Sequence, residues 1–194
     1  MKLKNILIIA ALASIPFVTP ATLAQNQICP QLAVVAPSRQ TKIIRQEKFA
    51  YSVKIPNNYK TMSLHSSELL IFDPNTFTLT QCLIKSKAAR EFPEHISIYA
   101  KAVNSKNRDL AYLVRQENPG GIEKVENTKV ANQAAISYTA NTLGFQKSVS
   151  FFTPDRKNII TVSAPFNIKQ GRPTTIFNQK VFAQVLSSFT FTRR

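Results

Sequence analysis

Residues 133–194 carry the clearest alternation of hydrophobic and polar positions in the chain. Two segments, at 134–141 and 145–151, place apolar side chains at every second position, and a further extended segment at 158–163 follows a Thr-Pro-Asp-Arg-Lys turn. The apolar positions of the first two segments are Ile136, Tyr138 and Ala140, followed by Phe145, Val149 and Phe151. Period-two patterning bounded by turn residues predicts half-buried antiparallel strands joined as a meander.

A helical pattern at 175–187 follows this meander. Its apolar residues recur four apart and are widened by two neighbours, which gives the set Phe177, Val181, Val185 and Phe189 with Phe182 and Leu186. Such a stripe is typical of a helix that buries one face. Because a meander with one apolar face needs a cover, we expect this helix to lie against the strands. The fold class predicted is α+β, with an antiparallel sheet covered by a C-terminal amphipathic helix.

The middle of the chain reads as short strands with one further helix. A strand at 49–55 alternates apolar and polar residues until a Pro-Asn-Asn turn stops it. The other elements expected are a turn or short helix at 42–46, a hairpin with arms at 60–65 and 68–72, an extended piece at 77–85, a strand at 96–102 and a helix at 107–117. A Pro-Gly-Gly sequence after residue 118 ends that helix.

The first 24 residues have the features of a secretory signal. Two lysines precede an apolar run at 6–18, and a Thr-Leu-Ala sequence provides a small-residue cleavage site before Gln25. The run is too short to span a bilayer and Pro16 interrupts it, so a retained anchor is the weaker alternative. We therefore expect a signal peptide at 1–24, a lead segment at 25–48 and one domain at 49–194. The exported compartment would be a periplasm, a thylakoid lumen or the extracellular space.

The chain is strongly basic, with 25 Lys and Arg against 10 Asp and Glu in 194 residues, a formal net charge of +15. Loss of Lys2 and Lys4 with the signal leaves +13. Such a charge attracts acidic protein surfaces or a membrane complex, but it is equally typical of a solvated surface that confers solubility. The candidate partner-binding cations are Lys85, Lys87, Arg90, Lys101, Lys106 and Arg108. Export and the lack of a basic helix or interleaved aromatics count against nucleic acid.

Cys29 and Cys82 are the two cysteines of the chain. In an exported protein such a pair most often forms a disulfide, because the compartment is oxidising. Closing a loop of about fifty residues is worth roughly 4 kcal/mol in the chain-entropy model. The alternative is a redox-active or metal-binding pair, which neither a CxxC spacing nor a neighbouring histidine supports.

Few residues suggest chemistry. A divalent cation could be held by His95 and Glu94 with His65 or Asp73, since imidazole and carboxylate suit zinc or manganese. Their spacing matches no zinc motif, and a histidine at a strand end is more often a polar surface residue. The sequence has no GxSxG elbow and no HExxH motif, and its four glycines give little material for a phosphate loop. We therefore expect no enzymatic activity and no cofactor beyond that possible metal ion.

The order of motifs across 49–191 resembles the PsbP-like family, the extrinsic lumenal proteins associated with photosystem II and their exported bacterial relatives. The motifs are the strand Phe-Ala-Tyr-Ser-Val-Lys-Ile-Pro at 49–56, Ile-Phe-Asp-Pro at 71–74, Ile-Ser-Ile at 96–98, Ala-Ile-Ser-Tyr at 135–138 and Ser188-Phe189. The resemblance implies an α/β/α sandwich with a central antiparallel sheet. Tyr59 stands where the family usually has Trp, Asn132 where a turn Gly is common, and 75–93 looks like an insertion.

Three classes of function stay open on the sequence. The first is a non-catalytic binding or assembly protein, a monomer peripheral to the membrane at most, which docks on a membrane complex or another anionic partner. The second is a periplasmic module that binds a small apolar or anionic ligand between sheet and helix. The third, a metal-dependent enzyme, would hold stoichiometric metal that is lost on His95→Ala.

Overall fold

The structure is a computed structural model that describes residues 29, 32–65, 67–87, 93–103, 109–141, 145–166 and 176–192, without the side chains of 176–178. The expected signal peptide, Arg90, Lys106, Arg108 and the side chain of Phe177 lie outside this range. The strands are β1 (Thr41–Gln46), β2 (Tyr51–Pro56), β3 (Lys60–Leu64), β4 (Glu68–Phe72), β5 (Ile96–Ala102), β6 (Ile122–Val130), β7 (Gln133–Asn141), β8 (Phe145–Phe152), β9 (Asn158–Pro165) and β10 (Thr190–Phe191). The helices are α1 (Pro74–Lys85), α2 (Leu110–Glu117) and α3 (Ile176–Ser187), with a 3-10 turn at Glu47–Phe49.

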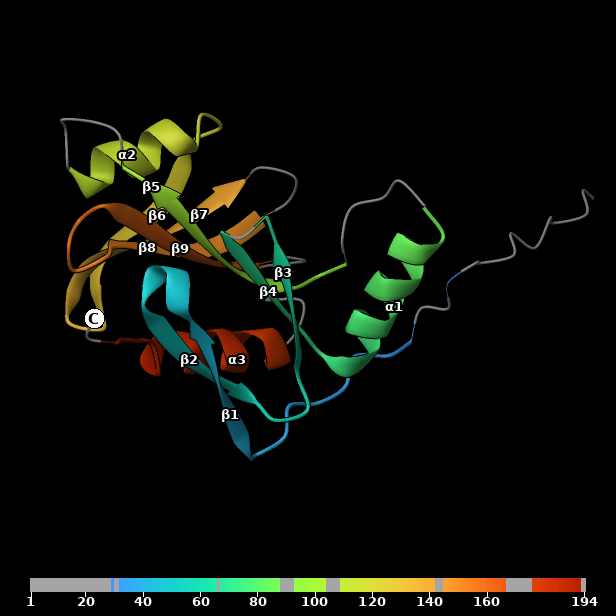
Figure 1. Cartoon of the computed structure of the whole chain (residues 1–194). Helices are drawn as coiled ribbons and strands as arrows, with labels where there is room; N and C mark the ends of the chain where they lie inside the picture. Colours follow the sequence, from blue (N-terminus) through green and yellow to red (C-terminus); the bar gives the residue numbers. More distant parts are fainter. Residues whose placement is uncertain are drawn as a thin grey trace, which may run out of the picture.

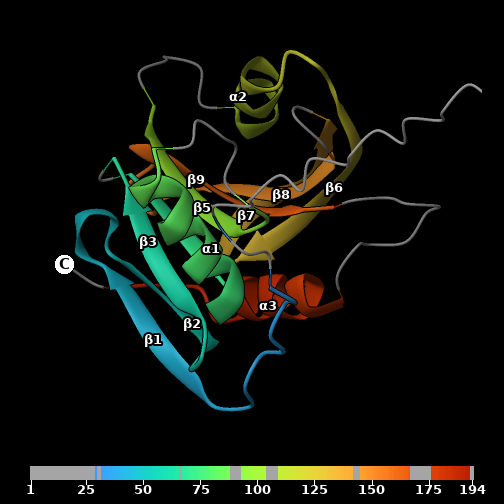
Figure 2. The same ribbon diagram turned by 90° about the vertical axis from the view of Figure 1, so that its right-hand side faces the viewer.

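Two antiparallel sheets organise this α+β fold. Seven strands form the larger sheet in the order β3-β4-β5-β9-β8-β7-β6, and β1-β2-β10 form a small one. The expected hairpin of β3 and β4 and the meander of β7, β8 and β9 are confirmed. Figure 1 and Figure 2 both show α2 on one face of the larger sheet and α3 on the other. The larger sheet therefore has a helix packed on each of its two faces.

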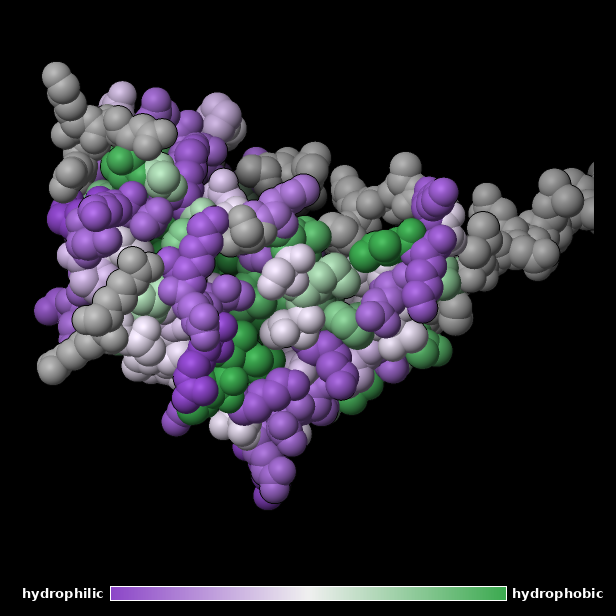
Figure 3. Space-filling view, in the orientation of Figure 1, coloured by the Kyte–Doolittle hydropathy of each residue, from purple (hydrophilic) through white to green (hydrophobic). Residues whose placement is uncertain are grey.

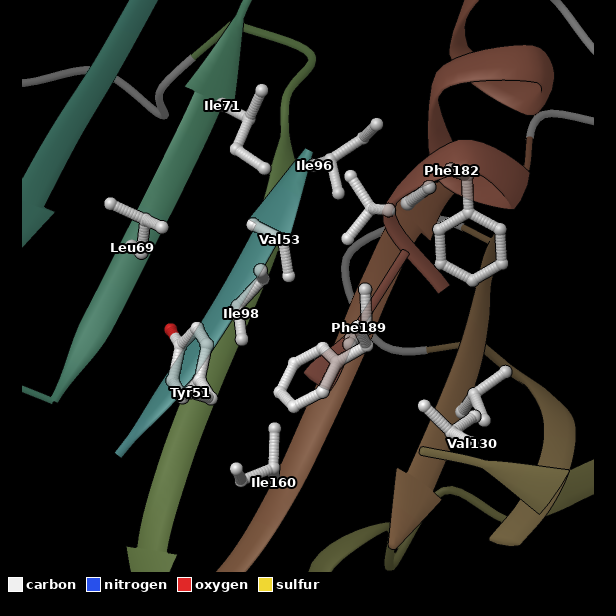
Figure 4. Close-up of a cluster of buried hydrophobic side chains, with 14 of the residues drawn as sticks. Tyr51, Val53, Leu69, Ile71, Ile96, Ile98, Val130, Ile160, Phe182 and Phe189 are labelled. Atoms are coloured by element: carbon white, nitrogen blue, oxygen red, sulfur yellow. The ribbon is translucent and has the colours of Figure 1, made fainter. Parts of the chain in front are cut away.

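The main hydrophobic core lies between the larger sheet, β2 and α3. Side chains from β2, β4, β5, β9 and α3 converge on it, as the labelled residues of Figure 4 show. Ile55, Ile98, Val162, Val181 and Val185 have no exposed surface in this cluster. Burial of each such side chain stabilises the fold by about 1.5–3 kcal/mol. Helix α3 contacts β2 and β9 through this face.

A second, smaller core lies on the opposite face of the sheet, beneath α2. Leu110, Leu113 and Val114 of α2 pack against Ile136 and Tyr138 of β7. In the register of β7 and β8, Ser137 rather than Ile136 is opposite Val149, so the two apolar sets face opposite ways. The expectation that Ile136 and Val149 share one face is therefore wrong, and the meander is covered on both faces.

The extended piece expected at 77–85 is wrong, because Pro74–Lys85 form helix α1. Asp73 caps this helix: its Oδ1 accepts hydrogen bonds from the backbone N–H of Asn75 at 3.1 Å and of Thr76 at 3.3 Å. Pro74 occupies the first turn, where its missing N–H costs nothing. The Asp-Pro pair thus starts a helix here rather than only ending the preceding strand.

The turn or short helix expected at 42–46 is also wrong, because β1 occupies these residues and pairs along its whole length with β2. The lead segment before it is fastened to the domain as well. The backbone N–H of Val35 donates to Asp73 Oδ1 at 3.1 Å, and Asn75 Nδ2 donates to Ala33 O at 2.7 Å. The lead segment therefore adds strand β1 to the small sheet and is hydrogen-bonded to the start of α1.

Candidate functional site

The outer face of the small sheet, away from the core, is a regular array of polar side chains with one apolar residue. The strand register places Arg45 of β1 opposite Ser52 of β2, and Ser52 opposite Thr190 of β10. The next row pairs Ile43 with Lys54. The hydroxyls of Ser52 and Thr190 share a hydrogen bond of 2.9 Å, which fixes the rows relative to each other. We call the exposed side of these three strands the β1–β2–β10 face.

This face is cationic and carries no acid. The strands β1, β2 and β10 contain Lys42, Arg45 and Lys54 but no Asp or Glu, and the nearest acid along the chain is Glu47 in the following turn. Ile43, at the centre of this face, is 50% exposed. A hollow of about 380 Å³ in this face is lined by Ile43, Ser52, Lys54, Ser187, Ser188 and Thr190. Ammonium, guanidinium and hydroxyl groups in this arrangement can bind carboxylate or phosphate oxygens.

Lys42 does not belong to this outer array, although it is part of β1. Its Nζ donates to the backbone oxygens of Asn57 at 3.0 Å and Tyr59 at 2.6 Å. Burial, together with the positive charge of Lys60, lowers the pKa of Lys42 below its ordinary value. This ammonium group therefore ties β1 to the turn that follows β2, whereas Arg45 and Lys54 remain at the surface.

The six cations predicted from the sequence do not form one cluster among the described residues. Lys85 is the last residue of α1 and Lys87 follows it, and Figure 1 shows this helix on the β3–β4 side of the molecule, away from α2. Lys101, at the end of β5, forms an ion pair with Glu117 of α2 at 3.1 Å. Arg45 and Lys54 were not among the predicted binding residues, because only the register of the small sheet brings them side by side.

Two of the four predicted metal ligands, Asp73 and His95, have other contacts. Asp73 is buried as the cap of α1, His95 Nδ1 lies 2.7 Å from Pro93 O, and the His95 ring lies 5.3 Å from the Phe72 ring. His65 sits at the β3–β4 turn with a positive φ of 47°. Within the described ranges no group of three or more His, Cys, Asp or Glu side chains is close enough to hold a metal ion.

The predicted disulfide is present between Cys29 and Cys82, with 5.7 Å between the two Cα atoms. It joins the lead segment to the last turn of α1. Because Thr80 is the one side chain that α1 buries fully among its residues, the helix gains little from packing. The bond therefore serves as a structural staple of a weakly packed helix.

A groove of about 520 Å³ runs between α3 and the β6–β8 end of the larger sheet. Its apolar side is lined by Val130, Val149, Phe182 and Leu186, and its polar side includes Glu126, Ser137 and Lys147. This size lies within the range of small-ligand sites. A smaller hollow of about 300 Å³ lies between Phe49, Phe191 and the β8–β9 turn.

Two buried tyrosines resist ionisation. Burial, and secondarily the charge of Asp73, raises the pKa of Tyr59 to about 12, and burial alone raises the pKa of Tyr51 above its ordinary range. The Tyr59 hydroxyl has no hydrogen-bond partner in the part of the chain that the structure describes. Both rings belong to the main hydrophobic core.

Comparison with known proteins finds structural neighbours only. No family model matches the chain, and no protein of known description matches it in sequence. The solution structure of cyanobacterial PsbP (CyanoP) from Synechocystis sp. PCC 6803 is similar at 14% identity and a TM-score of 0.46, covering 84% of this chain and 96% of that one. It belongs to the family that the sequence motifs resemble.

A crystal structure from Bacteroides thetaiotaomicron VPI-5482 is similar at 11% identity and a TM-score of 0.44. The match covers 82% of this chain and 50% of that one, so the chain spans about half the length of the Bacteroides protein. Because both TM-scores are below 0.5, nothing about the function of this chain follows from either likeness.

None of the helices in the described residues has the length and hydrophobicity that a bilayer span requires.

Proposed function

We propose that this protein is an exported, non-catalytic binding or assembly protein that docks on an acidic surface of a membrane-associated partner. The observation that carries the proposal is the β1–β2–β10 face, where Arg45 and Lys54 stand beside exposed Ile43 with no acid in the three strands. An apolar residue surrounded by cations and hydroxyl groups suits contact with a protein surface that carries complementary negative charge.

The opposing interpretation, a basic surface that only keeps the protein soluble, predicts acids interspersed with the cations. Strand β6 has that pattern: Glu123, Lys124, Glu126 and Lys129 alternate along an exposed strand. The contrast within one molecule favours a specific role for the acid-free face. The Cys29–Cys82 bond supports export, because disulfides persist in oxidising compartments.

The scaffold that we assign to this role is the α/β/α sandwich expected from the sequence, with α3 as its amphipathic cover. Support comes from α3, where Val181 and Val185 are fully buried while Gln179 and Lys180 are exposed. Ser188, directly after α3, links this cover to the docking face, since its Oγ accepts a hydrogen bond from the Lys54 backbone N–H at 2.9 Å. A rigid helix thereby supports one side of the face.

Salt extraction tests the docking proposal. The protein should remain with host membranes at about 0.1 M salt and leave them at about 1 M, because screening shortens the Debye length from about 10 Å to about 3 Å. Retention at about 1 M salt would argue against an electrostatic contact. The double variant Arg45→Glu/Lys54→Glu should lose attachment at low salt. Its matched control, Lys124→Glu/Lys129→Glu on β6, makes the same change in net charge and should remain attached.

A second candidate function rests on the groove beside α3. Its apolar side formed by Val149, Phe182 and Leu186, with Lys147 at the polar side, suits a small amphipathic anion. Native mass spectrometry of protein purified from its host would then show a bound small molecule. Ala183→Trp, which places a bulky ring from an exposed position into the groove, should remove that molecule and leave membrane attachment unchanged. A protein that is empty when purified gently would count against this candidate.

A further inference from the structure

We propose that the outer edge of β1 accepts an extended acidic segment of the partner as an added strand. This inference rests on the docking function proposed above and specifies how the partner binds. Strand β1 is the end member of the small sheet, and no described strand pairs with its second edge. It is six residues long and contains no proline. An exposed edge of this kind presents unpaired backbone groups that can template another strand.

The hydrogen-bond pattern identifies which residues of β1 offer these groups. In an antiparallel pair, residues alternate between positions bonded to the neighbouring strand and positions that point away from it. The Asn57 N–H donates to Gln40 O at 2.8 Å, so this pair is a bonded one. In the register that continues from it, Lys42 and Ile44 are also bonded to β2. The backbone N–H and C=O of Thr41, Ile43 and Arg45 therefore point outward.

The opposite side of β2 supports the same assignment. The Lys54 N–H donates to Ser188 Oγ at 2.9 Å, and the Thr192 N–H donates to Ala50 O at 2.8 Å. Even-numbered residues of β2 thus point towards β10, which leaves the odd-numbered residues to bond β1. Lys54 is opposite Ile43, so Ile43 cannot be using its backbone groups on β2.

The other edges in the described residues are less suited to pairing. Strand β6 has mixed charges and an irregularity between Glu123 and Glu126, both devices that protect an edge. Strand β10 has two residues, and β3 carries contacts with α1. Only β1 among these combines a regular ladder, half-exposed Ile43 and a single sign of charge.

Charge decides what the added strand must be. A residue directly opposite Arg45 in a new strand would have its Cβ about 4.5–5.5 Å away, where an opposite charge is favourable and a like charge is not. A second copy of this strongly basic chain would add cations to a cationic edge, and this disfavours pairing between two molecules of this protein. The occupant is therefore an extended segment with Glu or Asp at alternate positions.

The probe for this inference is a blocked ten-residue peptide of alternating Glu and Thr, with alternating Lys and Thr as the charge-reversed control. Titrated into the full chain at low salt, the acidic peptide should slow amide exchange at Thr41, Ile43 and Arg45. Exchange at Lys42 and Ile44 should not change, because β2 already binds their amides. The basic peptide should produce no effect.

Two variants separate strand addition from simple charge attraction. Ile43→Pro removes the outward N–H at an edge position where proline is tolerated, and should weaken binding about tenfold, the loss of roughly one backbone hydrogen bond. Ile43→Thr loses the same apolar side chain but keeps that N–H, and it should bind the acidic peptide about tenfold more tightly than Ile43→Pro. Equal thermal midpoints for the two variants verify that Ile43→Pro is folded.

The outcomes distinguish this inference from the docking function itself. If Ile43→Pro binds the acidic peptide as tightly as Ile43→Thr, or if the three outward amides gain no protection, strand addition at β1 is wrong. Failure of the acidic peptide to bind at all also overturns it. Salt-sensitive attachment to host membranes, measured separately, decides whether the docking function stands in those cases.

Discussion

Helices α1 and α3 have the same length, twelve residues, but are held in place by different forces. Helix α3 lies in the main core, where Val181 and Val185 are fully buried. Helix α1 buries only Thr80 fully among its described residues, and Ile84 is 49% exposed. Its place is set by the Asp73 cap, the lead segment and the Cys29–Cys82 bond. Packing therefore specifies one helix, and local capping with a covalent staple specifies the other.

An aspartate introduced into each helix gives the largest expected difference. Val185→Asp places a carboxylate in a core position without a partner and should lower the free energy of unfolding by more than about 4 kcal/mol. Ile84→Asp in α1 is its matched control and should change that free energy by less than about 0.5 kcal/mol. Urea unfolding followed by circular dichroism measures both. Equal losses would show that α1 is as deeply packed as α3.

Removal of the disulfide should act on α1 alone. The double variant Cys29→Ala/Cys82→Ala removes the covalent link between the lead segment and α1, of sequence separation 53, and should lower the free energy of local opening of α1 by about 2–4 kcal/mol. We expect amide exchange to accelerate throughout α1 while the amides of α3 keep their protection. Hydrogen exchange read by mass spectrometry distinguishes the two helices. Uniform acceleration in both would mean that the bond stabilises the whole domain.

Loss of the α1 cap should have a smaller effect. Asp73→Ala leaves the backbone N–H groups of Val35, Asn75 and Thr76 without their acceptor and should cost about 1–2 kcal/mol. Asp109→Ala, which removes the equivalent cap of α2, is the matched control, since Asp109 Oδ1 accepts from the Ala111 N–H at 3.1 Å. A larger loss at Asp73 in thermal unfolding would confirm that it fastens the lead segment as well as the helix.

The smallest expected effect at neutral pH comes from Tyr59→Phe. Its buried hydroxyl has no partner within the described chain, so its removal should be neutral or stabilise by about 1 kcal/mol. Tyr138→Phe is the control and should destabilise by about 1 kcal/mol, because Tyr138 Oη shares a hydrogen bond of 3.1 Å with Ser150 Oγ. Destabilisation by Tyr59→Phe would reveal a partner for that hydroxyl.

Alkaline pH gives Tyr59 a second readout. Its folded-state pKa of about 12 lies above the ordinary value of 10.0, so between these values the unfolded chain loses a proton that the folded one keeps. The stability that Tyr59 contributes through this difference in pKa is fully present below pH 10. It is lost as the pH rises through 12, which lowers the free energy of unfolding by roughly 2–3 kcal/mol. In Tyr59→Phe the free energy of unfolding should therefore depend less on pH between 10 and 12. Urea unfolding at several pH values measures this dependence.

The docking face could not be found from the sequence, although its residues are plain in it. Ile43 and Ile44 stand together in β1 without period-two alternation, because one points outward and the other into the core against β2. The register then places Arg45 and Lys54 beside Ser52 and Thr190, which are separated by 138 positions along the chain. Long-range pairing, rather than local pattern, creates such a surface.

The sequence by itself determined the elements that bury a regular apolar pattern: the β7–β9 meander, the β3–β4 hairpin, α3 and the cysteine pair. Periodicity suffices there because the hydrophobic effect acts on the same side chains that produce the pattern. The tertiary structure decided that the meander is covered on both faces and that β1 is the end strand of the small sheet, with no described strand on its second edge. These features depend on contacts between distant segments, which no local pattern encodes.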